Sequence, residues 1–271
     1  ARAMMKVENS TVSTTGDSSP AIMIADGGGI LIADGGSFTT SGAMSQGIYS
    51  KGDVTVTNAS VNALNAKAAV LKGNNTITLS GTTLEGKETA DTIPYNIVLF
   101  SDEKDIGTMG TQHFDVRGGS LISHKGGMFY VTATHGKISL NGTAITMDDP
   151  AANLITVAGN DGANGWGTPG RNGGHVELVA DNQILTGNIS VDSISNINMT
   201  LKNNSTFNGM ISIVPNAEGG EKYKTNADVF IAAGSTWNLT GNSTLTSLYN
   251  LGTINYNGYT ITLADGTVMK A

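Results

Sequence analysis

The stretch Val54-Thr55-Val56-Thr57-Asn58-Ala59-Ser60-Val61 is the clearest copy of a pattern that recurs along nearly the whole chain. Val54 and Val56 alternate with threonines, so the valines fall on one face of a strand and the threonines on the other. Asn58 follows the strand directly, and Asn, like Gly, tolerates the left-handed backbone region that a sharp corner needs. The pattern therefore predicts a strand with one buried face, a tight corner and a second strand.

The spacing of the copies indicates a repeat architecture. Similar segments start at Met5, Ile30, Val54, Ile77, Phe114, Ile138, Val176, Ile197 and Val229. The first three steps are about 25, 24 and 23 residues, inside the range of stacked repeats. One such repeat cannot bury its apolar side alone, but stacking continues each inward column from repeat to repeat. We therefore expect an all-β fold, a parallel β-solenoid that contains no helix.

A short apolar segment precedes each main strand, which predicts three strands per coil. These segments are 21–24, 47–50, 69–71, 97–100, 128–131 and 154–157. The chain length then gives roughly nine to eleven coils. Polar or Gly-rich stretches that interrupt the repeat predict surface loops at 85–93, 101–113, 158–175 and 215–228.

Composition agrees with short strands joined by many corners. The 271 residues include 36 Gly and only 14% charged side chains, whereas long helices favour Leu, Glu, Lys and Ala. The repeat covers the chain throughout, so we expect a single domain over residues 1–271. Because the repeat is already under way at Met5, we expect this domain to be a fragment of a longer surface protein.

Charge and cysteine content exclude several classes of function. The net charge of −7 disfavours binding to a phosphate backbone, so no nucleic-acid partner is expected. The chain has no cysteine, which excludes disulfides and thiolate metal sites. No run of about 18 apolar residues occurs, so no membrane-spanning helix is expected. The first residues also lack the long apolar region of an intact signal peptide.

Residues 229–263 carry a family resemblance. The segment Gly234-Ser235-Thr236-Trp237-Asn238-Leu239-Thr240-Gly241-Asn242-Ser243-Thr244-Leu245, followed by Leu251-Gly252-Thr253-Ile254, resembles the passenger repeats of bacterial autotransporter adhesins. The resemblance implies a right-handed parallel β-helix, a location outside the cell or on the bacterial surface, and attachment without catalysis. The implied partners are a host or bacterial surface glycan or protein, or a second copy of the chain. The resemblance supplies no set of functional residues.

The alternative function is a carbohydrate-active β-helix, since such folds often bind or cleave polysaccharides on one face. Cleavage needs clustered carboxylates, as an acid/base pair or as Ca²⁺ ligands. The dense groups are Asp102-Glu103 with Asp105, and Asp148-Asp149. Asp102, Asp148 and Asp149 are therefore candidate ligand-binding residues, and a sugar enzyme predicts that their loops converge with the loop around Trp166.

The Gly-rich stretch 158–175 is the second candidate region. Trp166 offers a stacking face and Arg171 a cation, and His175 closes the stretch. The glycines are not followed by Lys-Ser/Thr or by a helical pattern, so this is not a phosphate-binding loop. No metal-ligand spacing links the four histidines. His113, His124 and His135 recur at 11 residues, which is not a full coil and does not require a shared face. We expect no catalytic residues, no metal and no cofactor.

Thr-x-Thr pairs such as Thr55 and Thr57 raise the possibility of a flat, ice-binding array. That array would need the matching outward position to be Thr in many coils. Aligning the repeats instead predicts a mixed column, in which charge and bulk break the array: Lys6, Leu31, Thr55, Thr78, Asp115, Ser139, Glu177 and Phe230.

Overall fold

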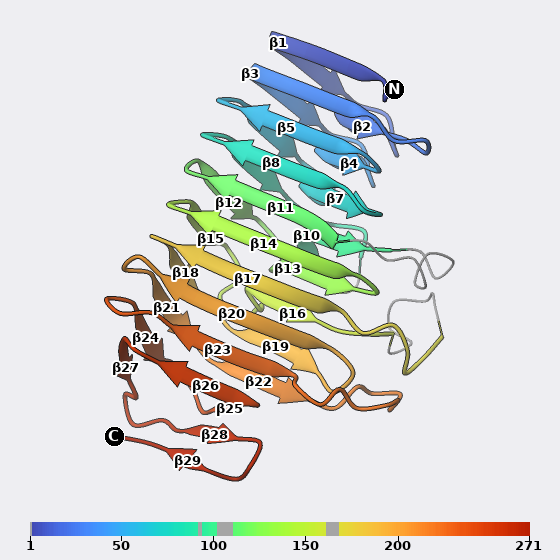
Figure 1. The fold of residues 1–271 in the computed structure, drawn as a ribbon. Coiled ribbons are helices and arrows are strands. Elements are labelled where there is room, and N and C mark those ends of the chain that lie inside the picture. The colour runs from blue at the N-terminus through green and yellow to red at the C-terminus, as the bar shows by residue number, and fades with distance from the viewer. Residues whose placement is uncertain (1, 92–93, 102–110, 161–167) are drawn as a thin grey trace.

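The computed structural model describes residues 2–91, 94–101, 111–160 and 168–271 (Figure 1). Within these ranges the chain forms strands and connections and no helix. The strands lie in long parallel sheets, the largest with 14 strands and the next with eight. The all-β, parallel part of the predicted fold is thereby confirmed.

The 14-stranded sheet contains two rows of strands. The first, which we call the main row, crosses the front of Figure 1. It consists of β1 (Met4–Thr14), β3 (Ile30–Thr40), β5 (Asp53–Thr57), β8 (Thr76–Ser80), β11 (Thr111–Arg117), β14 (His135–Asn141), β17 (His175–Asp181), β20 (Asn196–Lys202), β23 (Ala227–Ile231) and β26 (Ser247–Asn250). The second row continues from the ends of β1 and β3 through β6 (Ser60–Ala63), β9 (Thr83–Gly86), β12 (Ser120–Ser123) and β15 (Ala144–Met147).

The eight-stranded sheet supplies the third strand of each coil. It consists of β2 (Ile22–Ile24), β4 (Ile48–Ser50), β7 (Ala69–Lys72), β10 (Tyr95–Phe100), β13 (Gly127–Thr132), β16 (Ile155–Val157), β19 (Ile189–Asp192) and β22 (Ile211–Val214). The first six of these, from β2 to β16, are the short apolar strands that the sequence predicts, and the structure adds β19 and β22. The chain thus passes from the main row to the second row, then to the eight-stranded sheet, and returns to the main row beside its previous strand.

The last coils use two smaller sheets. In the position of the second row they place β18 (Ile184–Thr186), β21 (Thr206–Gly209), β24 (Thr236–Leu239) and β27 (Thr253–Asn255). A three-stranded sheet contains β25 (Ser243–Leu245), β28 (Ile261–Leu263) and β29 (Val268–Met269), and only β29 pairs antiparallel to its neighbour.

The core is the space between the rows. Alternate residues of each main-row strand point into it, and strand pairing places them in continuous columns. One column runs Leu31, Val54, Ile77, Phe114, Ile138, Leu178, Met199 and Val229, all buried. Burying one such side chain contributes about 1.5–3 kcal/mol. Trp237 is also fully buried, and its indole N–H donates to the Gly209 carbonyl at 2.9 Å.

The corner between the main and second rows is the same in most coils, and we call it the Asn/Gly corner. Its first residue has positive φ in eight coils: Asn9, Gly35, Asn58, Gly81, Gly118, Gly142, Asn182 and Asn203. The prediction that Asn58 takes the left-handed conformation at a sharp corner is therefore confirmed. Apart from Gly, few residues other than Asn accept this conformation. The corner needs only a few residues, so successive corners stack directly.

Pairing in the structure corrects two alignments made from the sequence. Met5 pairs with Leu31, not Ile30, so the second repeat starts one residue later than predicted. Leu31 is therefore buried, and Ile32 takes the outward position beside Thr55. The three consecutive residues Ile30 to Ile32 are all apolar, so alternation alone does not show which of them point inward. Likewise Ile138 pairs with Leu178 rather than Val176, so Val179, not Glu177, lies beside Ser139.

The predicted loops are partly right. Glu85 belongs to β9, so the first loop begins at Lys87. Residues 111–113 begin β11, His175 begins β17, and residues 227–228 begin β23. The parts of the predicted loops at 92–93, 102–110 and 161–167 lie outside the described residues.

Candidate ligand-binding groove

The outer face of the eight-stranded sheet carries an apolar cluster separate from the core. Strand pairing aligns the outward residues Tyr49, Val70, Val98, Tyr130 and Thr156 in one column along five strands. β10 explains the cluster, because its sequence Tyr-Asn-Ile-Val-Leu-Phe is apolar on both faces. A strand with one solvated face would alternate apolar residues inward with polar residues outward. This face is therefore built differently from the main row.

Aromatic rings dominate this face. Tyr95 and Tyr130 stack with ring centroids 5.0 Å apart and planes inclined by 28°. The Tyr95 hydroxyl donates to Thr156 Oγ1 at 2.7 Å, which fixes the ring. Phe100 lies under the Lys72 ammonium group, 4.6 Å from the ring centroid. Together with Tyr49 these side chains form a rigid aromatic surface.

The rings line a groove of about 400 Å³, which we call the tyrosine groove. Its lining consists of Met44, Gln46, Tyr49, Lys67, Val70, Glu88, Asp91, Tyr95, Val98, Phe100, Tyr130, Thr132, Thr156 and Ala158. Within the described ranges the buried Thr132 hydroxyl has no hydrogen-bond partner.

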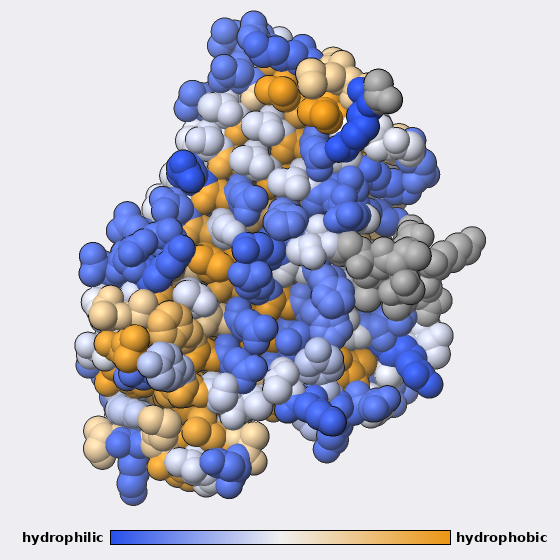
Figure 2. Space-filling view, viewed as in Figure 1, coloured by the Kyte–Doolittle hydropathy of each residue, from blue (hydrophilic) through white to orange (hydrophobic). Residues whose placement is uncertain are grey.

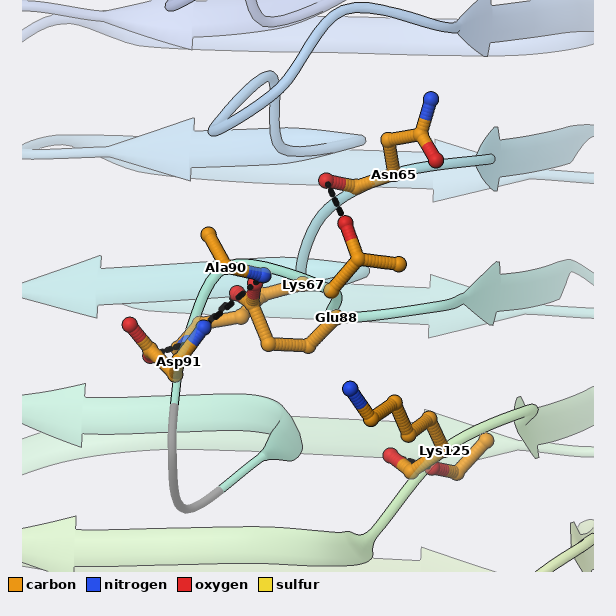
Figure 3. A network of polar contacts seen from close by, with 8 residues as sticks. Asn65, Lys67, Glu88, Ala90, Asp91 and Lys125 are labelled. Atoms are coloured by element: carbon orange, nitrogen blue, oxygen red, sulfur yellow. Dashed lines mark hydrogen bonds and ion pairs between the residues drawn. The ribbon is translucent and has the colours of Figure 1, made fainter.

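One rim of the groove is formed by the corner that leads from the second row into the eight-stranded sheet. We call it the carboxylate corner, after Glu85, Glu88, Asp91 and Asp148, and Figure 3 shows part of it. Lys67 Nζ lies 2.7 Å from Glu88 Oε2 and also pairs with Asp91. Glu88 Oε1 accepts from the backbone N–H of Ala90 at 2.7 Å and of Asp91 at 3.3 Å.

Glu88 is held in its ionised form. Burial alone would raise its pKa, but the hydrogen bond and charge of Lys67 and the two backbone N–H groups outweigh burial and lower it. A glycosidase acid needs the opposite, a raised pKa. Glu88 therefore orders the rim, while Asp91, whose side chain is 53% exposed, presents a carboxylate to the groove.

A second hollow of about 820 Å³ lies over the main row, between β8 and β20. Most of its lining residues are polar or charged, and Figure 2 shows this face as mostly hydrophilic. Charges there are largely paired: Lys137 with Glu177 at 3.0 Å and Lys202 with Asp181 at 3.4 Å. It has no aromatic lining, so it offers no stacking surface comparable with the tyrosine groove.

The four candidate residues within the described ranges fall into two separate groups. Asp148 and Asp149 lie on the carboxylate corner. Asp148 Oδ2 is 2.8 Å from His124 Nδ1, while the Asp149 carboxylate accepts from the Ala151 N–H at 3.1 Å. Arg171 and His175 lie at the other end of the strands, between β16 of the eight-stranded sheet and the main row. Asp102 and Trp166 lie outside the described residues.

The groove residues were missed by the sequence analysis. None of the four candidates in the described ranges lines the tyrosine groove. The signal that could have found it is the aromatic residue at the outward position of the short strands, Tyr49 in Ile48-Tyr49-Ser50 and Tyr130 in Phe129-Tyr130-Val131. Alternation assigns both to the solvent-facing side of the sheet. Polar residues are expected there, so two tyrosines at these positions indicate an aromatic surface.

His124 lies between two carboxylates on the same corner. Its Nδ1 contacts Asp148 and its Nε2 contacts Glu85, so three successive coils are connected by one side chain. Hydrogen bonds to Asp148 and then Glu85 raise the His124 pKa. Among the residues that the structure describes, no group of three or more His, Asp or Glu side chains is arranged to hold a metal ion.

Comparison with protein-family models, curated proteins and solved structures gave no match for the chain. In the described ranges no helix has the length and apolar character needed to cross a bilayer.

Proposed function

We propose that this chain is an adhesin-type attachment module, located outside the cell or on a bacterial surface, that holds an extended glycan in the tyrosine groove without cleaving it. The observation that carries the proposal is the rigid stack of Tyr95 and Tyr130, continued by Tyr49 and Phe100, on the outside of the eight-stranded sheet. Aromatic faces bind the C–H faces of sugar rings, and convergent polar groups bind the hydroxyls.

The groove repeats at the spacing of the strands. Tyr49 and Tyr130 are three strands apart in the sheet, which is about 14 Å at ~4.8 Å per strand. Each sugar of an extended chain of pyranose rings advances by about one strand spacing. About three sugars would therefore span the interval from Tyr49 to Tyr130. The exposed Asp91 carboxylate lines the groove and would accept hydrogen bonds from sugar hydroxyls.

For the fold we propose a right-handed parallel β-helix. The chain returns to the main row parallel to its previous strand in every described coil. Connections between parallel strands of one sheet are right-handed in about 98% of cases. The resemblance of residues 229–263 to autotransporter passenger repeats supports the same handedness, as well as the extracellular location. An experimental structure with a left-handed path would contradict the proposed handedness.

The test is a screen of the purified chain on acidic and neutral glycans, with and without Ca²⁺, followed by calorimetry on each glycan that binds. Tyr130→Ala and Tyr49→Ala should each weaken binding about tenfold or more, since tenfold is 1.4 kcal/mol and one aromatic contact supplies that order of energy. Tyr249→Ala is the matched control, because Tyr249 is an exposed ring stacked on Phe230 over the main row.

Three outcomes would overturn the proposal. Binding that survives both groove substitutions would place the glycan elsewhere. New reducing ends or unsaturated products, abolished when Asp148 and Asp149 are changed to Ala, would make the chain a carbohydrate-active enzyme. Concentration-dependent assembly without any glycan binding would assign attachment to contacts between copies of the chain.

A further inference from the structure

Two histidines far apart in the sequence meet on the outer face of the main row. His135 begins β14 and His175 begins β17, and strand pairing places them directly side by side. Their rings stack with centroids 4.7 Å apart and planes inclined by 29°. The next residue of the column is Asn196 of β20. This column lies at the corner where the chain returns from the eight-stranded sheet, away from the tyrosine groove lining.

Asn196 fixes the tautomer of His175. Its carbonyl Oδ1 lies 2.7 Å from His175 Nδ1. A carbonyl oxygen can only accept a hydrogen bond, so Nδ1 carries the proton and Nε2 keeps its lone pair. A hydrogen bond from the far ring nitrogen to an oxygen is the arrangement that orients metal-binding histidines in proteins and makes the other nitrogen a better ligand.

His135 is the exposed member of the pair. The two rings open into a small polar hollow of about 190 Å³, lined also by Thr111, Asn198 and the ion pair of Lys137 with Glu177. The Tyr223 ring packs against His175, with centroids 5.0 Å apart, and covers one side.

We propose that His135 and His175 together bind a divalent transition metal ion through their ring nitrogens, with water in the remaining positions. Imidazole nitrogens bind such an ion at about 2.0–2.1 Å through lone pairs in the ring plane, so binding requires the exposed His135 ring to turn out of the stack until its nitrogen lies beside that of His175. Imidazole suits Cu²⁺, Ni²⁺ and Zn²⁺ rather than Mg²⁺ or Ca²⁺, and Cu²⁺ binds most tightly in this series. The ion would connect two coils at their outer face.

The site differs from a structural zinc site. Such sites close with four protein ligands, whereas the described residues bring only two imidazoles to this point. Water therefore completes the coordination, and the ion remains exchangeable and open to a further ligand. The inference is independent of the tyrosine groove, since no residue of that groove contributes to it.

The test uses the full chain, treated with chelator and titrated with Cu²⁺ or Zn²⁺, with Mg²⁺ as the negative control. Calorimetry should give one Cu²⁺ per chain, and electron paramagnetic resonance should show two imidazole nitrogens on the ion. His135→Gln and His175→Gln should each reduce affinity at least about tenfold. Asn196→Ala removes only the orienting acceptor and should reduce it about tenfold, as for other residues behind metal ligands.

His124→Gln and His113→Gln are the matched controls. His124 has both nitrogens engaged by carboxylates, and His113 lies in a different column, beside Lys137. Neither change should alter Cu²⁺ affinity. The proposal is overturned if binding survives in the His135→Gln, His175→Gln double variant, if it is lost in His124→Gln, or if the spectrum shows a single nitrogen. Circular dichroism of every variant must match the parent, so that loss of binding is not loss of folding.

Discussion

The Asn/Gly corner and the carboxylate corner close the same coils by different means. The first uses backbone conformation: one residue of positive φ, repeated from Asn9 to Asn203. The second uses side chains, with Lys67, Glu88 and His124 forming ion pairs between successive coils. A corner made by backbone geometry must be the same in every coil. A corner made by side chains can change from coil to coil, and this one forms a rim of the tyrosine groove.

The largest effect should come from the stacked glycines of the Asn/Gly corner. A Cβ on Gly119 would lie 2.1 Å from the Thr82 carbonyl oxygen, and its φ is +63°. Gly119→Ala should therefore lower the free energy of unfolding by about 3 kcal/mol, from backbone strain and overpacking. Gly118 has nearly the same φ, +62°, but open space around it. Gly118→Ala should cost about 1 kcal/mol. Equal losses in urea unfolding would show that close stacking of the corners is unimportant.

The next effect should come from Glu88. Its side chain is 4% exposed, so Glu88→Gln weakens charged hydrogen bonds in a buried site, at a cost of about 2 kcal/mol. The native pKa of Glu88 lies below its ordinary 4.5. Its contribution is therefore present above about pH 4.5 and is lost as the pH falls through the native pKa.

Unfolding free energies measured from pH 7 to pH 3 should show the parent and Glu88→Gln converging at low pH, because Glu88 is then protonated in both states of the parent. A constant difference over the whole range would mean that ionisation of Glu88 does not stabilise this corner.

A smaller effect is expected where the Asn/Gly corner uses asparagine. Asn58 has φ of +51°, which Ala accepts poorly and Gly accepts freely. Asn58→Ala should cost about 1 kcal/mol, whereas Asn58→Gly should remain within about 0.5 kcal/mol of the parent. If both variants lose the same stability in urea unfolding, the side chain of Asn58, and not its backbone conformation, is what the corner requires.

The smallest effect concerns His124, which is partly exposed. Its pKa is raised above the ordinary 6.5 by Asp148 and Glu85, so its contribution to stability is complete below pH 6.5 and is lost as the pH rises through the native pKa. Proton NMR should place the His124 pKa above 6.5, and Asp148→Asn should bring it down. Asp149→Asn is the control, since the Asp149 carboxylate accepts from the Ala151 N–H and not from His124. Equal shifts in the two variants would contradict the contact seen in the structure.

The repeated corner is also what could be predicted from sequence. Alternating valines and a following Asn or Gly are local signals, and they located most main strands and the Asn/Gly corner. Register was harder, because Ile30 to Ile32 are all apolar and because Val176 and Leu178 fit the same face. Both errors keep the strand but move its residues to another column.

The candidate sites required contacts that local signals do not contain. Tyr95 and Tyr130 belong to neighbouring strands 35 residues apart in the chain. His135 and His175 are separated by 40 residues, far more than the usual step, because the Gly-rich stretch 158–174 lies between them. The regular interval fails at that insertion, so no local signal places the two histidines side by side.

Pairing between successive coils has a mechanical consequence. Every strand of the main row from β3 to β23 is bonded only to strands one coil before or after it, so each coil is held by its two neighbours. Under a pulling force on one end, such a stack releases one coil at a time, and each release exposes the next. The molecule should therefore extend in many small, similar steps and dissipate load gradually, which suits a tether that is stretched repeatedly.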